Sequence, residues 1–389
     1  MLPEADGGSL HLQARACPTV LVLSVSAGAG HVRAAQALCA GAVCLPVQTL
    51  HLDVMDFVPS RFRKLYTDVY IRMVGKYPHA WGYLYRGMNR ARPDDRSQRL
   101  RRWFEQWQAR ALLARIDELR PDAIVCTHFM PAELLAHGRA TGSSTCPVWV
   151  QVTDFDLHRI WIQPGVTGYF VGSEEVAYRM RAEGVAAAAI HVQGLPIMPA
   201  FGRPCSRVDN ARRLGLNPHC KTVLLMGGGF GLGNFEQIAR RLLALDPTLQ
   251  VIALAGRNIA LMGQLAPLVA RYPDRFVVQG QTDEVERFMA CADLVVTKSG
   301  GLTCAECLAI GLPMIVNAPI PGQEERNADF LVEQGVAMKA IDDITVEYRV
   351  SHLLAHPKVL AAMAARAREI ALPGAAAQAM RIVLAHLQW

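Results

Sequence analysis

The chain has 389 residues, a length typical of two domains rather than of one hydrophobic core. Hydrophobic residues make up 51% of it and charged residues 19%, which excludes a disordered chain, and because it contains no run of about 18 uncharged apolar residues we predict no transmembrane helix. The net charge is +6, and the first residues lack the basic start and long apolar stretch of a signal peptide, so we expect a cytoplasmic protein, soluble or peripherally bound to a membrane.

Short apolar runs alternate with helical patterns along the chain, which predicts parallel sheets covered by helices on both faces. The expected strands are residues 20–25, 46–52, 123–127, 147–152, 168–172 and 189–193, and then 221–226, 250–255, 275–279, 293–297 and 313–317. We interpret residues 194–204, rich in Gly and Pro, as an interdomain linker. The predicted fold class is α/β, with two doubly wound, Rossmann-like domains facing a central cleft: residues 1–196 and 197–373, with a final helix, about 374–389, packing back on the first domain.

The first predicted strand runs through glycines directly into a helix, and the stretch SAGAGHVRAAQAL places His31 at the join. Glycines at such a turn let the backbone approach a phosphate closely. A histidine titrates near neutral pH, and a helix N-terminus disfavours its charged form, so His31 is suited to act as a general base. For an isolated histidine, a structural position near the helix start would be the better interpretation.

A basic, aromatic segment follows. Residues 61–115 contain fourteen Lys and Arg but only four Asp and Glu, an excess larger than the net charge of the whole chain. Aromatic residues such as Trp81 and Trp103 are interleaved with these cations. Such a segment can lie on anionic lipid with Trp and Tyr at headgroup depth, bind nucleic acid by stacking bases on its aromatics, or form an amphipathic helix pair with a solvated arginine face.

Polar residues stand at the ends of the next two strands, where ligands bind in this architecture. CTHFMPAELLA places His128 after one strand, and VQVTDFDLHRIW places Asp154 and His158 after the other. Each can contact a ligand or serve equally well as a structural hydrogen-bonding partner. Asp154 and Asp156 could also hold Mg²⁺, because carboxylates two residues apart in an extended segment point the same way.

The second half begins with a glycine-rich loop. VLLMGGGFGLGN, residues 223–234, is a strand, five glycines in seven positions, and then a helix. The backbone N–H groups there can approach an anion, at Gly227, Gly228, Gly229 and Gly231. The loop lacks the GK[ST] of a P-loop, and the following strand ends in Arg257 and Asn258 instead of the acidic residue of a dinucleotide site.

TKSGGLTCAECLAIGLPMIVNAPIPGQEERNA, residues 297–328, predicts a strand, a turn at Gly300 and Gly301, a helix from near Thr303, a second strand and a polar loop. Glu306 lies one turn into that helix, where a carboxylate can accept hydrogen bonds from two ribose hydroxyls. The loop offers donors and acceptors for a hexose ring at Gln323, Glu324 and Asn327. Cys304 and Cys307 form a CxxC, but no partner pair stands at zinc spacing, so we expect reduced thiols.

This stretch resembles the donor-site signature of glycosyltransferase family 28, most specifically in APIPGQEERNA, and the likeness is greatest to the family's diacylglycerol glycosyltransferases. LLMGGGFGLGN is similar to the family's diphosphate loop, and SAGAGHVRAAQAL to its loop ending GHxxAAxAL. One departure is Ser299, where the family commonly has proline. The resemblance, from about residue 20 to 340, implies the GT-B fold, an inverting transfer from a UDP-sugar, and no required metal or other cofactor.

The resemblance also implies roles for single residues. His31 is the predicted general base, Gly30 lies in the acceptor-side loop with His128, Asp154 and His158 nearby, and His128 and Asp154 are the alternative catalytic residues. The predicted donor-binding residues are Gly227, Gly228, Gly229, Gly231, Arg257, Asn258, Ser299, Gly300, Gly301, Thr303, Glu306, Gln323, Glu324 and Asn327. With a lipid acceptor, the membrane becomes the favoured partner of the basic segment, through Arg61, Arg63, Lys64, Tyr66, Trp81, Arg101, Arg102, Trp103 and Trp107, and nucleic acid the least favoured.

The expected function is therefore transfer of a hexose from a UDP-sugar to the hydroxyl of diacylglycerol or a related lipid, at the inner face of the cell membrane. Two alternatives stay open: transfer of N-acetylglucosamine to a polyprenyl-diphosphate-linked acceptor, and a non-catalytic protein that binds a UDP-sugar or lipid. The identity of the hexose cannot be read from the sequence, because the same polar loop serves glucose, galactose and N-acetylglucosamine.

Overall fold

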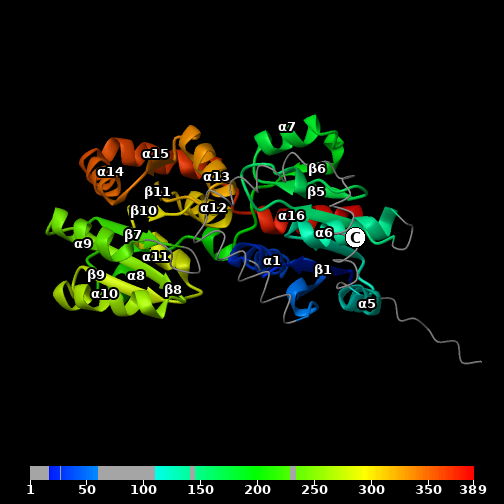
Figure 1. The fold of residues 1–389 in the computed structure, drawn as a ribbon, viewed down its shortest axis with the longest axis horizontal. Coiled ribbons are helices and arrows are strands. Elements are labelled where there is room, and N and C mark those ends of the chain that lie inside the picture. Colours follow the sequence, from blue (N-terminus) through cyan, green and yellow to red (C-terminus); the bar gives the residue numbers. More distant parts are fainter. Residues whose placement is uncertain (1–16, 27, 60–109, 141–144, 228–233) are drawn as a thin grey trace, which may run out of the picture.

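The computed structural model describes residues 17–26, 28–59, 110–140, 145–227 and 234–389 (Figure 1). They form two units, each built on a six-stranded parallel sheet with helices on both faces. The sheets are ordered β2-β1-β3-β4-β5-β6 and β12-β11-β10-β7-β8-β9. The predicted fold class, two doubly wound parallel domains, is confirmed.

The first unit contains β1 (Thr19–Ser24), α1 (Ala29–Gly41), β2 (Gln48–Asp53), η1 (Val54–Asp56), α5 (Arg110–Leu119), β3 (Ala123–Cys126), α6 (Phe129–Ala140), β4 (Val148–Gln151), η2 (Arg159–Trp161), β5 (Gly168–Val171), α7 (Glu174–Ala182), η3 (Ala187–Ala189) and β6 (Ile190–Val192). The predicted linker follows and contains the short helix η4 (Pro199–Gly202). Its apolar side chains Leu195, Ile197 and Phe201 are buried in the core of the second unit, so this segment is packed.

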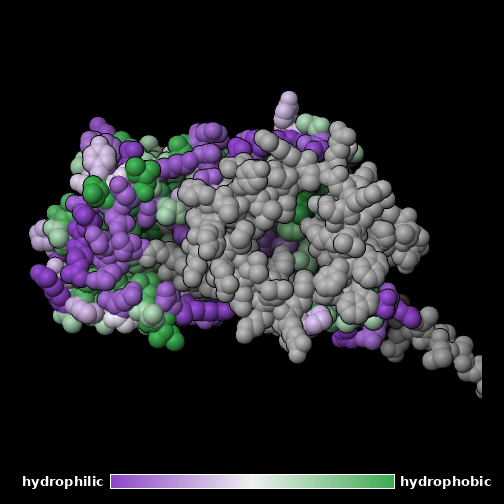
Figure 2. All heavy atoms as spheres, viewed as in Figure 1, coloured by the Kyte–Doolittle hydropathy of each residue, from purple (hydrophilic) through white to green (hydrophobic). Residues whose placement is uncertain are grey.

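The second unit contains α8 (Arg207–Arg213), β7 (Thr222–Met226), α9 (Phe235–Leu245), β8 (Gln250–Gly256), α10 (Ile259–Arg271), β9 (Phe276–Gly280), α11 (Val285–Cys291), β10 (Leu294–Thr297), α12 (Gly301–Ile310), β11 (Met314–Asn317), α13 (Gln323–Glu333), β12 (Ala337–Ala340), α14 (Asp343–Ala355) and α15 (Pro357–Ile370). In the view of Figure 2 its surface is mainly hydrophilic, with hydrophobic side chains scattered between. Such scatter is normal for a folded protein in water.

Local sequence explains where these elements start and stop. The central strands are continuous apolar runs because both faces of a parallel sheet are covered, as in TVLVLS of β1, which is buried throughout. Helices α7, α10 and α14 begin at residues whose side chains accept a backbone N–H of the first turn, namely Ser173, Asn258 and Asp342. Helix α12 ends at Gly311, whose φ of 75° is readily adopted only by glycine.

In each sheet the order of the strands changes direction once, and the position of that reversal indicates which loops can bind a ligand. In the first sheet the reversal lies between β1 and β3, where Leu23 pairs with Cys126. In the second it lies between β7 and β10, where Met226 pairs with Thr297. Ligands of doubly wound sheets bind at the carboxyl ends of the strands beside such a reversal. The loops after β1, β7 and β10 are therefore the ones expected to contact ligand.

The last helix, α16 (Ala375–His386), returns to the first unit. Ala376, Met380 and Val383 are buried in one cluster with Val20 and Val22 of β1. Helix α16 packs so closely on α1 that a side chain at Gly41 would lie 2.8 Å from the backbone nitrogen of Ala377. The first hydrophobic core is thus completed by residues that follow the whole second unit.

Three details differ from the expectations. Strand β12 was not predicted, because its four residues include Lys339 and form no apolar run. Helix α12 begins at Gly301 rather than near Thr303, since glycine tolerates the tight contact at its start. Gln323 and Glu324, expected in a polar loop, are the first residues of α13.

In the described part of the chain, none of the helices has the length and apolar character needed to cross a bilayer.

We predict that Met380→Ala lowers the free energy of unfolding by about 2–5 kcal/mol, because it leaves a cavity between α16 and the first sheet. Met380 is 0% exposed. Gln378→Ala, on the exposed face of the same helix, is the control and should change stability by less than about 0.5 kcal/mol. Urea denaturation measures both. A loss in Met380→Ala no larger than that in Gln378→Ala would contradict a stabilising contribution of the buried face of α16.

Candidate active site between the two sheets

A pocket of about 500 Å³ lies between the two units. The first unit lines it with the loop after β1, the first turns of α1 and the end of β2, at Ser26, Gly28, Ala29, Gly30, Val32, Arg33, Gln36 and Asp53. The second unit contributes the ends of β7, β8 and β9 and the start of α12, at Met226, Gly227, Leu254, Gly256, Arg257, Gly280, Gln281, Thr282, Asp283, Val285, Leu302, Thr303 and Glu306. Five predicted site residues therefore line one pocket, namely Gly30, Gly227, Arg257, Thr303 and Glu306.

His31 lies on the neighbouring side of the same helical turn, facing the ends of β3 and β4. Its Nδ1 is 2.7 Å from the carbonyl oxygen of Thr127. A carbonyl only accepts, so Nδ1 carries the proton and donates it, and the neutral ring keeps a free lone pair on Nε2. The hydroxyl of Thr127 also donates to the carbonyl oxygen of His31, at 2.9 Å. Thr127 thus fixes both the ring and the backbone of His31.

Burial keeps this histidine neutral. It lowers the pKa of His31 to about 4, and the hydrogen bond to Thr127 offsets only part of that effect. The position in the first turn of α1 acts in the same direction, because a helix N-terminus disfavours a positive charge. His31 is therefore a neutral imidazole at neutral pH, with an unprotonated Nε2 that can accept a proton.

The other two predicted acceptor-side histidines have structural bonds. The Nδ1 of His128 accepts the backbone N–H of Met130 at 3.0 Å, and that of His158 accepts the backbone N–H of Ile160 at 3.1 Å. His158 thereby caps η2. His128 packs edge-on against His31, with 4.6 Å between ring centroids, and burial together with His31 holds its pKa below the usual range. His128 therefore lies beside the candidate base, and His158 is a buried helix cap.

Glu306 is a buried carboxyl group that lines the pocket. It is 7% exposed, one turn into α12, and burial raises its pKa to about 7. Arg33, on α1 of the other unit, partly offsets this rise. Helix α12 begins after Gly300 with no side-chain cap among the described residues, and the N–H groups of a helix's first turn can bind an anion. A carboxylate and a helix N-terminus on one short segment can hold a hydroxylated, negatively charged ligand.

The remaining donor-side residues that the structure describes are not among those that line this pocket. Ser299 donates to the backbone oxygen of Glu324 at 2.6 Å, and Glu324 accepts the backbone N–H of Ile320 at 2.6 Å. Burial raises the pKa of Glu324, and Lys298 opposes that rise. The side-chain oxygen Oε1 of Gln323 is buried without a hydrogen-bond partner among the described residues. Asn258 caps α10. Gln323 thus carries a free acceptor that a ligand hydroxyl could satisfy.

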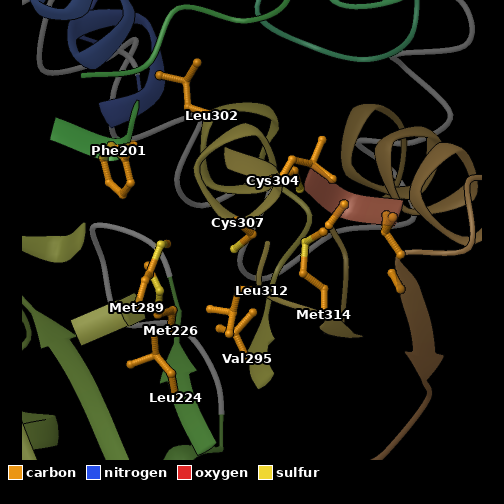
Figure 3. Packing of buried hydrophobic residues seen from close by; sticks show 14 of the residues in the cluster. Phe201, Leu224, Met226, Met289, Val295, Leu302, Cys304, Cys307, Leu312 and Met314 are labelled. Carbon is orange, nitrogen blue, oxygen red and sulfur yellow. The ribbon is translucent and has the colours of Figure 1, made fainter. Parts of the chain in front are cut away.

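The two motifs with metal-ligand spacing do not form joint sites. Asp156 accepts a hydrogen bond from Arg179 at 2.6 Å, whereas Asp154 accepts one from Asn327. Cys304 and Cys307 are fully buried on α12, among apolar side chains (Figure 3). No group of three or more His, Cys, Asp or Glu that could hold a metal occurs within the described ranges. The independence from metal implied by the resemblance stays a prediction.

Some predicted residues lie outside the described residues: Gly228, Gly229 and Gly231 of the glycine-rich loop and Arg61, Arg63, Lys64, Tyr66, Trp81, Arg101, Arg102, Trp103 and Trp107 of the basic segment. Conversely, the structure adds Arg33, Asp53 and Asp283 to the pocket, and Thr127 to the candidate base. Two of these four residues carry a sequence signal that could have identified them. Arg33 stands two residues after His31, and Asp53 ends a strand beside β1.

Comparison with known proteins agrees with this geometry. The monogalactosyldiacylglycerol (MGDG) synthase family matches residues 31–197, and the glycosyltransferase family 28 C-terminal domain matches residues 222–379. The chain belongs to glycosyltransferase family 28. The family predicted from APIPGQEERNA is thus confirmed. One match falls within the first unit of the structure and the other covers most of the second.

A curated relative and two solved structures are also similar to this chain. The processive diacylglycerol beta-glucosyltransferase of Bacillus subtilis is 28% identical over 91% of this chain and 91% of its own length. The fold is shared with MurG of Acinetobacter baumannii (16% identity, TM-score 0.59, 94% of this chain and 98% of that one). It is also shared with MnaA of S. aureus, solved with UDP (12% identity, TM-score 0.60, 95% and 97%). The predicted GT-B fold is confirmed.

We predict that Glu306→Gln changes the pH dependence of stability in this family 28 member. Because the pKa of Glu306 rises from 4.5 to about 7 on folding, the native state holds this proton more tightly than the unfolded chain. Between these two values, ionisation lowers the stability of the wild type as pH rises, whereas glutamine does not ionise. The variant should gain up to about 3 kcal/mol relative to wild type from pH 4.5 to pH 8, at about 1.4 kcal/mol per pKa unit.

Denaturant titrations at pH 4.5 and pH 8 measure that gain. Glu333→Gln, on the exposed end of α13, is the control and should show no such change. A constant stability difference between wild type and Glu306→Gln across this range would contradict a buried, protonated Glu306.

Proposed function

We propose that this protein is an inverting glycosyltransferase that moves a hexose from a UDP-sugar to the hydroxyl of diacylglycerol or a related membrane lipid. The observation that carries the proposal is the unprotonated Nε2 of a neutral His31, which two hydrogen bonds to Thr127 hold beside an interdomain pocket lined by the first turns of α12 and Glu306. Membership of family 28 and the similarity to diacylglycerol glucosyltransferases support it.

In this proposal the second unit holds the donor. Gly227, at the end of β7, and the start of α12 receive the diphosphate through backbone N–H groups. Glu306 accepts hydrogen bonds from the ribose hydroxyls. The free acceptor on Gln323, with Glu324 beside it, binds the hexose. Arg33 approaches the same pocket from the first unit and adds a positive charge opposite the leaving group.

The first unit supplies the proton acceptor. His31 Nε2 takes the proton of the acceptor hydroxyl while its oxygen forms a bond to the anomeric carbon of the hexose. The bond from that carbon to the diphosphate breaks at the same time, and UDP leaves with the electron pair. Attack opposite the leaving group inverts the anomeric centre. The carbonyl of Thr127 stabilises the imidazolium that forms, because its bond to Nδ1–H strengthens when the ring is charged.

The lipid acceptor follows from the first unit, whose match is to monogalactosyldiacylglycerol synthases. The same match disfavours a polyprenyl-diphosphate-linked acceptor, and a purely binding protein would have no need of a prepared base. The relatives are named as glucosyltransferases, which makes UDP-glucose the first donor to test. The excess of cations in residues 61–115 supports peripheral binding at the anionic inner face of the cell membrane.

We predict that His31→Ala lowers kcat for transfer by about 10²–10⁴-fold, the usual contribution of a general base. Its dissociation constant for UDP should stay close to the wild-type value, because His31 does not line the donor pocket. The assay incubates the protein with diacylglycerol liposomes and each UDP-hexose and identifies the lipid product, and calorimetry gives UDP binding.

His219→Ala, an exposed histidine of the second unit, is the control for that experiment. A larger loss in His128→Ala than in His31→Ala would transfer the role of base to His128. Failure of the wild type to modify any lipid with any UDP-hexose would reject the proposed function.

We predict that the protein binds liposomes containing anionic lipid, and that added salt weakens this binding steeply. Each Lys or Arg near an anionic surface contributes roughly 1 kcal/mol, and salt screens it. Sedimentation with vesicles of phosphatidylcholine, with and without phosphatidylglycerol, measures the effect. Equal binding to both vesicle types would contradict an electrostatic membrane surface.

A further inference from the structure

Asn327 forms hydrogen bonds between the two units. It lies on α13 of the second unit and is 0% exposed. Its Nδ2 donates to the carboxylate of Asp154 at 2.9 Å and to the backbone oxygen of Ser299 at 3.0 Å. Its Oδ1 accepts the backbone N–H of Phe155 at 2.8 Å. Rotating the amide by 180° would set its N–H groups against a donor, so this orientation is fixed.

Apolar and backbone contacts continue the same junction. The ring of Phe155 stacks on that of Phe330, with 4.6 Å between centroids and 6° between planes. Gly301, the first residue of α12, lies so close to Thr153 that a Cβ would overlap the carbonyl oxygen of Thr153. Residues 153–155 of the first unit are therefore held between α12 and α13, the two helices that carry the donor-side residues.

The same segment reaches the candidate base. The hydroxyl of Thr153 lies 3.3 Å from Nδ1 of His31, the atom that also donates to Thr127. On the donor side, Ser299 receives a bond from Asn327 and donates to Glu324. A continuous path of bonded groups thus runs from Glu324 through Ser299, Asn327 and residues 153–155 to His31.

We propose that Asn327 is a positioning residue for the transfer reaction. It fixes the position of residues 153–155 relative to the donor-binding helices α12 and α13, and through Thr153 it orients the ring of His31. The proposal rests on the proposed function. It assigns Asn327 a role other than the donor contact expected from the sequence, since both N–H groups of its amide are already used within the protein. Asp154 is its acceptor in the first unit, and the negative charge of Asp154 is not used in proton transfer.

Kinetics of Asn327→Ala separate these roles, using diacylglycerol and the UDP-hexose that the wild type transfers. A positioning role lowers kcat by roughly 10–100-fold, since a displacement of about 1 Å can cost that much. The dissociation constant of the UDP-hexose, measured without lipid, then stays within about threefold of the wild-type value, because Asn327 does not itself contact the donor. Glu333→Ala, on the exposed end of α13, is the matched control and should retain wild-type kcat.

A second set of variants tests the path from the other unit, and remains informative if Asn327→Ala does not fold. Asp154→Ala should reproduce the loss in kcat, and Asp154→Asn should recover most of it, because the amide oxygen still accepts from Asn327. The double variant Asn327→Ala with Asp154→Ala should be little worse than either single one, since both break one connection.

Three results would overturn the proposal while leaving the proposed function intact. Weaker UDP-hexose binding in Asn327→Ala, in proportion to the lost activity, would make Asn327 a donor contact. Asp154→Asn as inactive as Asp154→Ala would show that the carboxylate itself takes part in the chemistry. Wild-type kcat in both alanine variants would show that the junction does not set His31. An inactive wild type would instead reject the proposed function.

Discussion

Every strand of both sheets is parallel to its neighbours, and this constraint decides where everything else lies. Parallel strands need helical crossovers, so all carboxyl ends of a sheet gather at one edge. The two edges face each other, because the pocket is lined by residues after β1 and β2 on one side and after β7, β8 and β9 on the other. Residues hundreds of positions apart, such as Arg33 and Glu306, therefore share one cavity.

Burial between these edges changes the chemistry of the groups that it encloses. It lowers the pKa of His31 to about 4 and raises those of Glu306 and Asp154 to about 7 and about 6, so that at neutral pH the histidine is neutral, Glu306 is partly protonated and Asp154 is still ionised. A neutral histidine can accept a proton, and a partly protonated Glu306 repels an expected diphosphate less than a full carboxylate would. Entry of the donor would bring its own charge, which Arg33, Arg257 and the α12 N-terminus can balance.

The fold was predictable because its signals are local. Runs such as TVLVLS and TVLLM are long enough to identify buried strands, and their alternation with helices implies parallel sheets. Strand β12 was missed because a four-residue edge strand with a lysine carries no such signal. His31 and Glu306 could be proposed as site residues because a short motif fixes the place of each relative to a strand end, and their roles stay predictions.

The contacts between the units could not be predicted in this way. Nothing near Asn327 in the sequence indicates that it bonds to Asp154 and Phe155, which lie 173 and 172 positions earlier. Likewise, Thr127 lies next to a predicted site residue, but its two bonds to His31 depend on how β3 and α1 pack. A single sequence specifies which groups are chemically able to act, whereas their partners depend on the three-dimensional packing.

The position of α16 has a consequence for how the chain reaches its native state. The core formed by β1, α1 and the middle of the first sheet contains Ala376, Met380 and Val383, so it stays open until α16 has been synthesised. The second unit, whose own clusters are complete by Ala367, can close earlier on the ribosome. Domains usually fold in the order of their synthesis, the N-terminal one first. Here one of the two cores of the half that carries His31 is completed only by the last helix, whereas its other core is built from residues 21–180 alone.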